Sequence, residues 1–346
     1  MPLPVIGVIG GSGFIGSALV RALQQAGQEV RIIDRAPSQA YPDAWMEADV
    51  RDRDALREAC YGCDVLYNLA AEHRDDVRPV ELYHQVNVLG ALHTCEVAEQ
   101  LGIERLIFTS TVAVYGLQEG EVDETAATRP FNEYGRTKLE AEQVFRGWAE
   151  RREGRSLTIV RPTVVFGPDN RGNVYTLLEQ IARGRAVVIG DGRNRKSIAY
   201  VENVVGFLVH ALTFSPGVHV FNYADKPDLD MNELTALARA ALGNQRARTL
   251  RIPYVLGLGA GVIADLAARL TGRRFPVSAI RVRKYRAHTQ FASARLRATG
   301  FVPRHDLRDA LASTIRHEFG SPEQRTPLPR ASAPGGRRAE KQAQQR

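Results

Sequence analysis

The chain has 346 residues, of which 44% are hydrophobic and 25% are charged, and it carries a formal net charge of +7. This length and composition indicate a folded protein with one large or two medium domains, and they exclude a disordered chain or a miniature disulfide fold. With three cysteines, no secretory signal and no apolar run long enough to span a bilayer, the sequence predicts a cytoplasmic protein.

Residues 5–166 alternate short β-branched runs with segments of helical period. The predicted strands are VIGVIG, EVRIID, DVLYNLA, RLIFTS and LTIVRP, and amphipathic segments such as SALVRALQQAG lie between them. Strand followed by helix, repeated, predicts parallel strands joined by right-handed crossovers. We therefore expect an α/β fold with a doubly wound parallel Rossmann sheet.

The second half of the chain is less regular. Residues 171–183, 203–213, 231–242, 254–270 and 305–319 have helical patterns, and VHVFNYA is predicted to return to the main sheet. We expect a dinucleotide-binding domain over 1–168, joined by 196–225, and a smaller, mainly helical substrate lobe over 169–195 and 226–320. The basic tail, 321–346, is rich in Pro, Gly and Gln and is predicted to be disordered.

Two classes of partner are excluded by pattern. No aromatic-interleaved basic strand or recognition helix stands in the sequence, so we expect no nucleic-acid partner. Cys60 and Cys63 have CxxC spacing, but no second pair or nearby histidine pair completes a ligand set, so we expect no metal site.

A glycine-rich segment, GVIGGSGFIGSALVRAL, follows the first predicted strand and opens the first helix. In that context Gly10 makes the turn, Gly13 lets the backbone approach a pyrophosphate, and Gly16 lets the helix pack on the strand. The helix N-terminus, with Phe14 and Ile15, then faces the anion. The context favours dinucleotide binding over an ordinary strand-helix turn.

The type of dinucleotide follows from Asp34 at the end of the second strand. A carboxylate there accepts hydrogen bonds from the adenosine ribose and repels a 2′-phosphate, which favours NAD over NADP, although the adjacent Arg35 weakens this preference. The remaining predicted cofactor contacts follow later strands and helices: Asp49, Val50, Leu69, Ala70, Ala71, Asn87 and Pro162.

Candidate catalytic residues stand in NEYGRTKLEAE, where Tyr134 and Lys138 lie four apart and so share one face of a helix. An adjacent ammonium and an oxidised nicotinamide both favour the phenolate form of the tyrosine, which makes it a usable proton acceptor. The hydroxyl partner is predicted in FTSTVAVYG, as Thr111 with Ser110 beside it.

Together these motifs resemble the extended short-chain dehydrogenases/reductases of the nucleotide-sugar epimerase and dehydratase group, over residues 5–319. The resemblance implies that Thr111 and Tyr134 contact the sugar hydroxyl being oxidised, and that Lys138 holds the nicotinamide ribose. Hydride then passes between sugar C4 and NAD. Tyr134 and Lys138 therefore count as cofactor contacts too.

The choice of reaction depends on the residues that directly follow Thr111, where this chain has no carboxylates. Dehydratases of this family carry an Asp-Glu pair immediately after the catalytic threonine, and this chain has Val112 and Ala113 there, so elimination is not expected. The cluster AEHRDDVRP, residues 71–79, either lines the sugar site or caps the following helix. Two reactions remain: 4-epimerisation through a transient 4-keto sugar, and reduction of a 4-keto sugar.

A narrower resemblance concerns the substrate. NLAAEHRDDV, RGNVY and FPVSAIRVRKYRAHTQF are similar to segments of the bacterial epimerases that convert undecaprenyl-diphosphate-linked N-acetylglucosamine to the N-acetylgalactosamine form, for surface polysaccharides such as O-antigen. The resemblance places Asn173 and Lys196 near the diphosphate, with Asn173 expected also as a helix N-cap. Arg281 and Lys284 are further candidates.

The stretch RLTGRRFPVSAIRVRKYR, residues 269–286, holds seven cations and no acid, and the apolar helix predicted over 254–270 precedes it. Such a helix followed by cations is predicted to lie peripherally on an anionic membrane surface. The alternatives are a core helix with a site for soluble UDP sugars, in a UDP-sugar 4-epimerase or a UDP-4-keto-6-deoxy-sugar reductase, and a non-catalytic NAD-binding protein. By analogy with the family we expect a homodimer.

Overall fold

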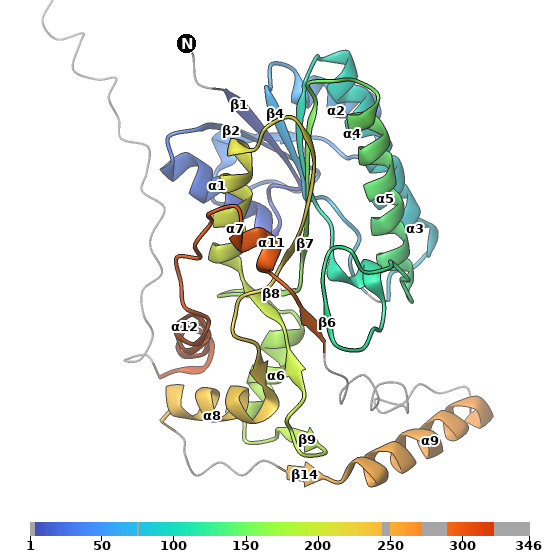
Figure 1. Cartoon of the computed structure of the whole chain (residues 1–346), viewed down its shortest axis with the longest axis vertical. Helices are drawn as coiled ribbons and strands as arrows, with labels where there is room; N and C mark the ends of the chain where they lie inside the picture. The colour runs from blue at the N-terminus through green and yellow to red at the C-terminus, as the bar shows by residue number, and fades with distance from the viewer. Residues whose placement is uncertain (1–3, 75, 244–249, 272–288, 322–346) are drawn as a thin grey trace, which may run out of the picture.

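A seven-stranded sheet forms the centre of the protein in the computed structural model, which describes residues 4–74, 76–243, 250–271 and 289–321 (Figure 1). The strand order is β12-β7-β5-β4-β1-β2-β3, and every neighbouring pair is parallel. The strands are β1 (Val5–Ile9), β2 (Glu29–Asp34), β3 (Trp45–Glu47), β4 (Val65–Asn68), β5 (Arg105–Thr109), β7 (Ser156–Pro162) and β12 (Gly217–Tyr223). The predicted doubly wound sheet is confirmed.

Helices cover both faces of this sheet. α1 and α7 pack together on one face, and α2, α4 and α5 cover the other (Figure 1). Their bounds are α1 (Phe14–Gln25), α7 (Val201–His210), α2 (Arg53–Cys60), α4 (Gly90–Gln100) and α5 (Glu133–Glu150). In β1, Ile6 and Val8 join the core under α1, whereas Ile9 joins the core under α2 and α4. Because both faces are covered, the strands contain continuous apolar runs, such as VIGVI in β1.

The strand order reverses at β1, which has β2 on one side and β4 on the other. In open parallel sheets ligands bind outside the carboxyl ends of the strands at such a reversal. The turn after β1, the ends of β2 and β4, and the 3₁₀ turn Val112–Tyr115 after β5 all lie at this edge. The topology therefore gathers the predicted motifs at one place.

The C-terminal lobe combines helices with small two-stranded sheets. The helices are α6 (Asn173–Ala182), α8 (Met231–Ala241), α9 (Tyr254–Thr271), α11 (Ala294–Arg297) and α12 (Leu307–Phe319). The sheets pair β8 (Val164–Phe166) with β11 (Ile198–Tyr200), β9 (Val187–Ile189) with β14 (Leu250–Ile252), β10 (Arg195–Lys196) with β13 (Leu229–Asp230), and β6 (Glu121–Val122) with β15 (Gln290–Phe291). These short strands were not predicted from the sequence.

The segment 196–225 divides between the two parts of the molecule. α7 packs on α1 and β12 joins the main sheet beside β7, whereas β11 pairs with β8 outside that sheet. A buried carboxylate, Asp228, holds the lobe together by accepting hydrogen bonds from Ser197 Oγ at 2.6 Å and Gln290 Nε2 at 2.9 Å. The division of the chain at residue 168 stays a prediction.

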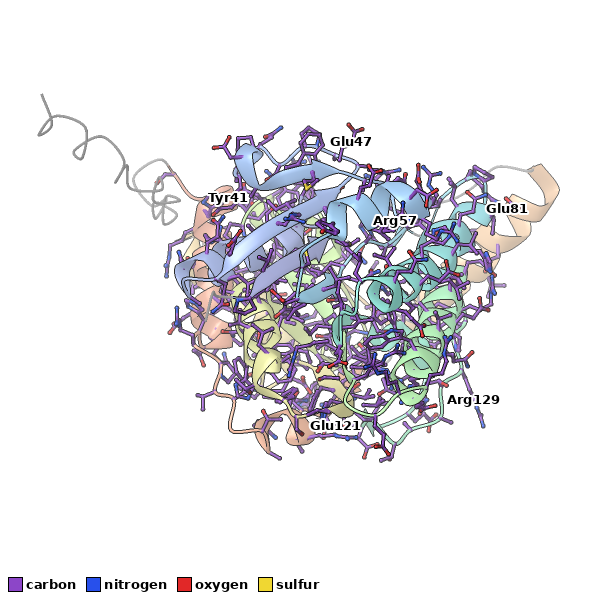
Figure 2. All side chains as sticks on the ribbon, turned by 90° about the horizontal axis from the view of Figure 1, so that it is seen from above. Tyr41, Glu47, Arg57, Glu81, Glu121 and Arg129 are labelled. Carbon is purple, nitrogen blue, oxygen red and sulfur yellow. The ribbon has the colours of Figure 1, made fainter. Side chains whose placement is uncertain are left out.

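The helix α9 extends from the lower end of the lobe, and in the view from above it reaches past the body of the molecule (Figures 1 and 2). Leu250 in β14 and Val255, Leu256 and Val262 in α9 expose 53% to 77% of their surface. Within the described ranges, every helix is too short or too polar to cross a membrane. Arg281, Lys284 and the tail from 322 onward lie outside the described residues.

Candidate active site

A cavity of about 1250 Å³ opens at the carboxyl ends of the sheet strands and continues into the C-terminal lobe. This volume exceeds the usual range for a single small ligand, and it suits a dinucleotide together with a second substrate. The cavity brings together nearly all of the predicted site residues: Gly10, Gly13, Phe14, Ile15, Gly16, Asp34, Arg35, Asp49, Val50, Leu69, Ala70, Ala71, Ser110, Thr111, Tyr134, Lys138, Pro162, Asn173 and Lys196.

The glycines after β1 form a cradle that side chains would fill. A Cβ on Gly16 would lie 2.3 Å from the carbonyl oxygen of Gly10, so the helix packs directly on the turn. Gly10 has a φ of +80°, and a Cβ there would lie 2.6 Å from the backbone nitrogen of Ala70. Gly13 is the N-cap of α1 and supplies no side-chain cap. The cradle therefore fits a dinucleotide pyrophosphate at the helix N-terminus.

Carboxylates at the ends of neighbouring strands line the cavity beside this cradle. Asp34 Oδ2 accepts a hydrogen bond from the Ser12 N–H and Oδ1 accepts one from the Ala36 N–H, both at 3.0 Å. The Arg51 guanidinium, hydrogen-bonded to Asp49, lowers the pKa of that carboxyl. Arg35 lies 3.7 Å from Glu72, a further cavity residue. Asp34 is thus fixed in place as a hydrogen-bond acceptor, as a ribose diol requires.

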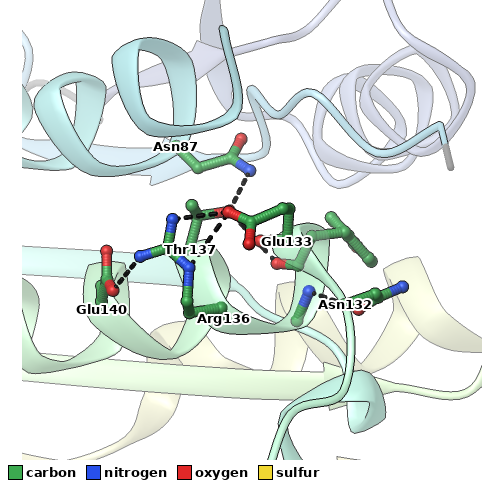
Figure 3. Close-up of polar contacts among 8 residues, drawn as sticks. Asn87, Asn132, Glu133, Arg136, Thr137 and Glu140 are labelled. Carbon is green, nitrogen blue, oxygen red and sulfur yellow. Dashed lines mark hydrogen bonds and ion pairs between the residues drawn. The ribbon is translucent and has the colours of Figure 1, made fainter. Parts of the chain in front are cut away.

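The first turn of α5 places Tyr134. Asn132 caps this helix, because its Oδ1 accepts a hydrogen bond from the Gly135 N–H at 2.9 Å (Figure 3). On the facing wall Thr111 caps the 3₁₀ turn after β5, with Oγ1 accepting from the Ala113 N–H at 3.1 Å. Both residues line the same cavity.

Lys138, one turn after Tyr134, is buried. Its Nζ lies 4.1 Å from the centroid of the Phe108 ring, which provides a cation-π contact. Burial lowers the pKa of Lys138 to about 7, although the charge of Glu142 acts in the opposite direction. The ammonium is therefore poised to change protonation near neutral pH, close to the tyrosine whose phenolate it would stabilise.

Asn87 is the predicted cofactor contact that lies outside the cavity lining. It lies in the π-helical turn His84–Leu89, is 3% exposed and is not among the cavity-lining residues. Its Nδ2 donates to Thr137 Oγ1 at 2.9 Å (Figure 3). The same Nδ2 donates to the Glu72 carbonyl, and the Asn87 Oδ1 accepts from the Glu72 N–H. In this structure the amide clamps the loop after β4 to α5, and a direct contact between Asn87 and the cofactor stays a prediction.

Sequence reasoning missed two threonines. Thr109 and Thr163 both line the cavity, and their Oγ1 atoms are buried with no hydrogen-bond partner among the described residues. Buried hydroxyls without partners are rare, so these two atoms are suited to meet polar groups of a ligand. Only their positions, directly beside the predicted Ser110 and Pro162, could have drawn attention to them.

At the lobe end of the cavity, Asn173 is the first residue of α6, and Gly172 is the N-cap. The predicted capping role of Asn173 is therefore wrong, and its exposed side chain faces the cavity. Burial lowers the pKa of Lys196, also in the lining, to about 8. His73 lines the cavity as well, whereas the N-cap of the following helix Glu81–Tyr83 is Val80.

Known proteins resemble this chain in sequence and in structure. The NAD dependent epimerase/dehydratase family matches residues 6–224. The N-acetyl-alpha-D-glucosaminyl-diphospho-ditrans,octacis-undecaprenol 4-epimerase of Escherichia coli O157:H7 is 44% identical over 314 residues, which cover 90% of this chain and 94% of that protein.

Among solved structures, MoeE5 in complex with UDP-glucose and NAD has a TM-score of 0.68 and 26% identity, over 90% of this chain and 97% of its own. The UDP-N-acetylglucosamine 4-epimerase of Bacillus cereus has a TM-score of 0.72 at 17% identity, over 92% of this chain and all of its own, and so supports the fold alone. The cradle, the catalytic constellation and these matches together place the chain in the NAD-dependent epimerase/dehydratase family.

Proposed function

We propose that the protein is an NAD-dependent sugar 4-epimerase that converts N-acetylglucosaminyl-diphospho-undecaprenol to N-acetylgalactosaminyl-diphospho-undecaprenol. The observation that carries this proposal is the 44% identity over 94% of the length of an epimerase named for that substrate. The intact set of Thr111, Tyr134 and Lys138 at the wall of one cavity supports it, and argues against a non-catalytic NAD-binding role.

The cradle at Gly10, Gly13 and Gly16 would hold the NAD pyrophosphate, and Asp34 the adenosine ribose. NAD held there would supply reversible hydride acceptance at sugar C4, so that no reductant would be consumed. Tyr134 accepts the proton of the C4 hydroxyl and later returns it. The Thr111 hydroxyl orients the same oxygen.

Lys138 assists Tyr134 electrostatically. Its ammonium lies on the same face of α5, buried against Phe108, where the low dielectric strengthens its effect on a nearby phenolate. Next to Thr111 the cavity is lined by Val112 and Ala113, which offer no carboxylate for elimination. The residues are therefore suited to oxidation and reduction at one carbon.

The lobe end of the cavity would receive the diphosphate. Asn173 offers a neutral hydrogen-bond donor and Lys196 a cation, while Leu177, Met231 and Leu234 supply apolar surface beside them. The exposed apolar side chains of β14 and α9 would rest on the cytoplasmic face of the inner membrane, from which the lipid-linked sugar is drawn. A homodimer, with pairing through helices such as α4 and α5, stays a prediction.

The test is a parallel epimerisation assay without added reductant. Purified protein is offered N-acetylglucosaminyl-diphospho-undecaprenol in detergent and, separately, UDP-N-acetylglucosamine. We expect turnover of the lipid-linked sugar alone. Turnover of the UDP sugar alone would replace the proposal with a UDP-sugar 4-epimerase, and a need for reduced cofactor with a 4-keto sugar would indicate the reductase.

A further inference from the structure

A buried carboxylate stands on the catalytic face of α5. Tyr134, Lys138 and Glu142 follow one another at intervals of four residues and therefore share one side of the helix. Glu142 is 1% exposed. Its oxygens accept three hydrogen bonds, from Ser110 Oγ at 2.5 Å, Arg161 Nε at 2.8 Å and Arg161 Nη2 at 2.5 Å. The mechanism given above uses none of these contacts.

The partners of Glu142 belong to the walls of the active site. Ser110 directly precedes Thr111, and Arg161 directly precedes Pro162. The next residue is Thr163, whose hydroxyl has no hydrogen-bond partner among the described residues. The network continues from Arg161 Nη1 to the Tyr115 hydroxyl at 2.7 Å. That hydroxyl donates to Asn222 Oδ1 in β12 at 2.8 Å. One carboxylate thus joins the catalytic helix to the ends of β5 and β7.

Glu142 also acts on the charge of Lys138. The groups that face the lysine are Tyr134 on α5, the Phe108 ring from β5 and, one turn further along α5, Glu142. Burial lowers the pKa of Lys138 to about 7, and the negative charge of Glu142 raises it. Without that charge the buried lysine would lose the negative charge that raises its pKa, and burial would disfavour the protonated form further.

We propose that Glu142 is a positioning residue of this epimerase: it fixes Ser110, and with it Thr111, against the helix of Tyr134, and it places a negative charge on the face of that helix that carries Lys138. The inference rests on the proposed function for its activity assay. The effect of Glu142 on the charge of Lys138 concerns the cofactor-free protein as well.

The experiment compares Glu142→Gln and the double variant Glu142→Gln/Arg161→Gln with the wild type. The pH dependence of kcat/KM is measured with N-acetylglucosaminyl-diphospho-undecaprenol, because this quantity reports groups of the free enzyme. For Glu142→Gln we expect kcat to fall at least about tenfold. In the same variant the alkaline limb of the plot of kcat/KM against pH should move to lower pH by about one unit. The kcat of the double variant should lie between those of the wild type and Glu142→Gln, because no uncompensated guanidinium remains in the double variant.

Glu318→Gln serves as the matched control. The Glu318 side chain is 4% exposed, pairs with Arg171 and accepts from the Asp169 N–H at 2.7 Å, but it does not line the cavity. This variant should lose stability and keep the wild-type alkaline limb. A purely structural role of Glu142 predicts the same for Glu142→Gln, so an unmoved limb in that variant overturns the proposal.

A second measurement is independent of turnover. The Lys138 side-chain NMR signal of the cofactor-free protein, assigned by its loss in Lys138→Met, is titrated in each variant. If the wild type turns over no lipid-linked sugar but the Glu142→Gln signal titrates at lower pH, the proposed function fails and the role in protonation stands. An unchanged titration contradicts the role in protonation. If Glu142→Gln does not fold, the double variant, which leaves no unpaired guanidinium at residue 161, carries both measurements.

Discussion

The two ends of the cavity are built in different ways. The cofactor end stands on seven paired parallel strands, and its closest contacts are between backbone atoms, as at Gly16. The lobe end stands on two-stranded sheets of two or three residues, held by side-chain hydrogen bonds such as those of Asp228. The predicted catalytic residues are thus placed by the more extensively paired part, and the lobe, which would receive the diphosphate, is less extensively paired.

The largest effect is expected at the catalytic wall, with Tyr134→Phe. Tyr134→Phe removes the group that accepts the proton of the C4 hydroxyl, so kcat should fall by about 10³-fold. Epimerisation of the lipid-linked sugar measures it. Tyr61→Phe is the matched control, because Tyr61 is 74% exposed and lies outside the cavity, and it should keep wild-type activity. Retained activity in Tyr134→Phe would remove the tyrosine from the mechanism.

The next effect concerns the backbone cradle. In Gly16→Ala the new Cβ would meet the Gly10 carbonyl at 2.3 Å, so the turn must open; the free energy of unfolding should fall by about 3 kcal/mol, and NAD binding should be lost. Gly147→Ala is the control, since Gly147 lies within α5 and a Cβ there meets nothing within 4 Å. It should gain about 1 kcal/mol. Urea denaturation and NAD titration measure both variants, and equal stability in the two would contradict a tight cradle.

A smaller effect is expected for Lys138→Met, which should gain stability while it loses activity. Burial holds the pKa of this lysine at about 7 in the folded protein, below the ordinary value of 10.5, so the unfolded chain binds more protons between these pH values. The destabilisation is therefore fully present below about pH 7 and is relieved as pH rises toward 10. Lys138→Met should raise the free energy of unfolding by about 2 kcal/mol at about pH 6.5 while activity is lost.

The pH dependence of that gain is the sharper part of the prediction. Near pH 9.5 the folded wild-type protein carries a neutral lysine, so the advantage of Lys138→Met should shrink to about a third or less of its value at pH 6.5. Unfolding curves of the cofactor-free proteins at the two pH values measure this. A gain that does not change with pH would show that packing, and not the buried charge, is responsible.

The cofactor end of the cavity could be predicted from the sequence better than the lobe end. The cradle glycines, Asp34, Tyr134 and Lys138 are placed by local spacing within single strands, turns and helices, and that spacing is visible in the chain. The partners of Glu142 lie 19 and 32 residues away, and Asn87 meets Thr137 at a separation of 50, so only the folded topology brings them together. Strands of two residues carry no alternation, which is why the small sheets of the lobe were missed.

The smallest effect tests the surface of the lobe. Val255 and Leu256 in α9 expose 77% and 65% of their surface, and a membrane contact would remove this apolar area from water. Val255→Glu/Leu256→Glu should weaken co-sedimentation with anionic phospholipid vesicles about tenfold, because the acids also meet repulsion from the lipid charge. Val302→Glu is the control, because Val302 is 80% exposed between α11 and α12, and this variant should co-sediment with vesicles as the wild type does.

Activity in detergent then decides what the lost binding means. If the double variant turns over detergent-solubilised substrate at the wild-type rate, α9 delivers the enzyme to the membrane and takes no part in the reaction. If the rate falls in detergent as well, the helix shapes the lobe end of the cavity, and the apolar surface has a second role. Unchanged sedimentation would mean that these two side chains do not meet the bilayer, and the lipid-linked sugar would have to reach Asn173 and Lys196 by another side of the lobe.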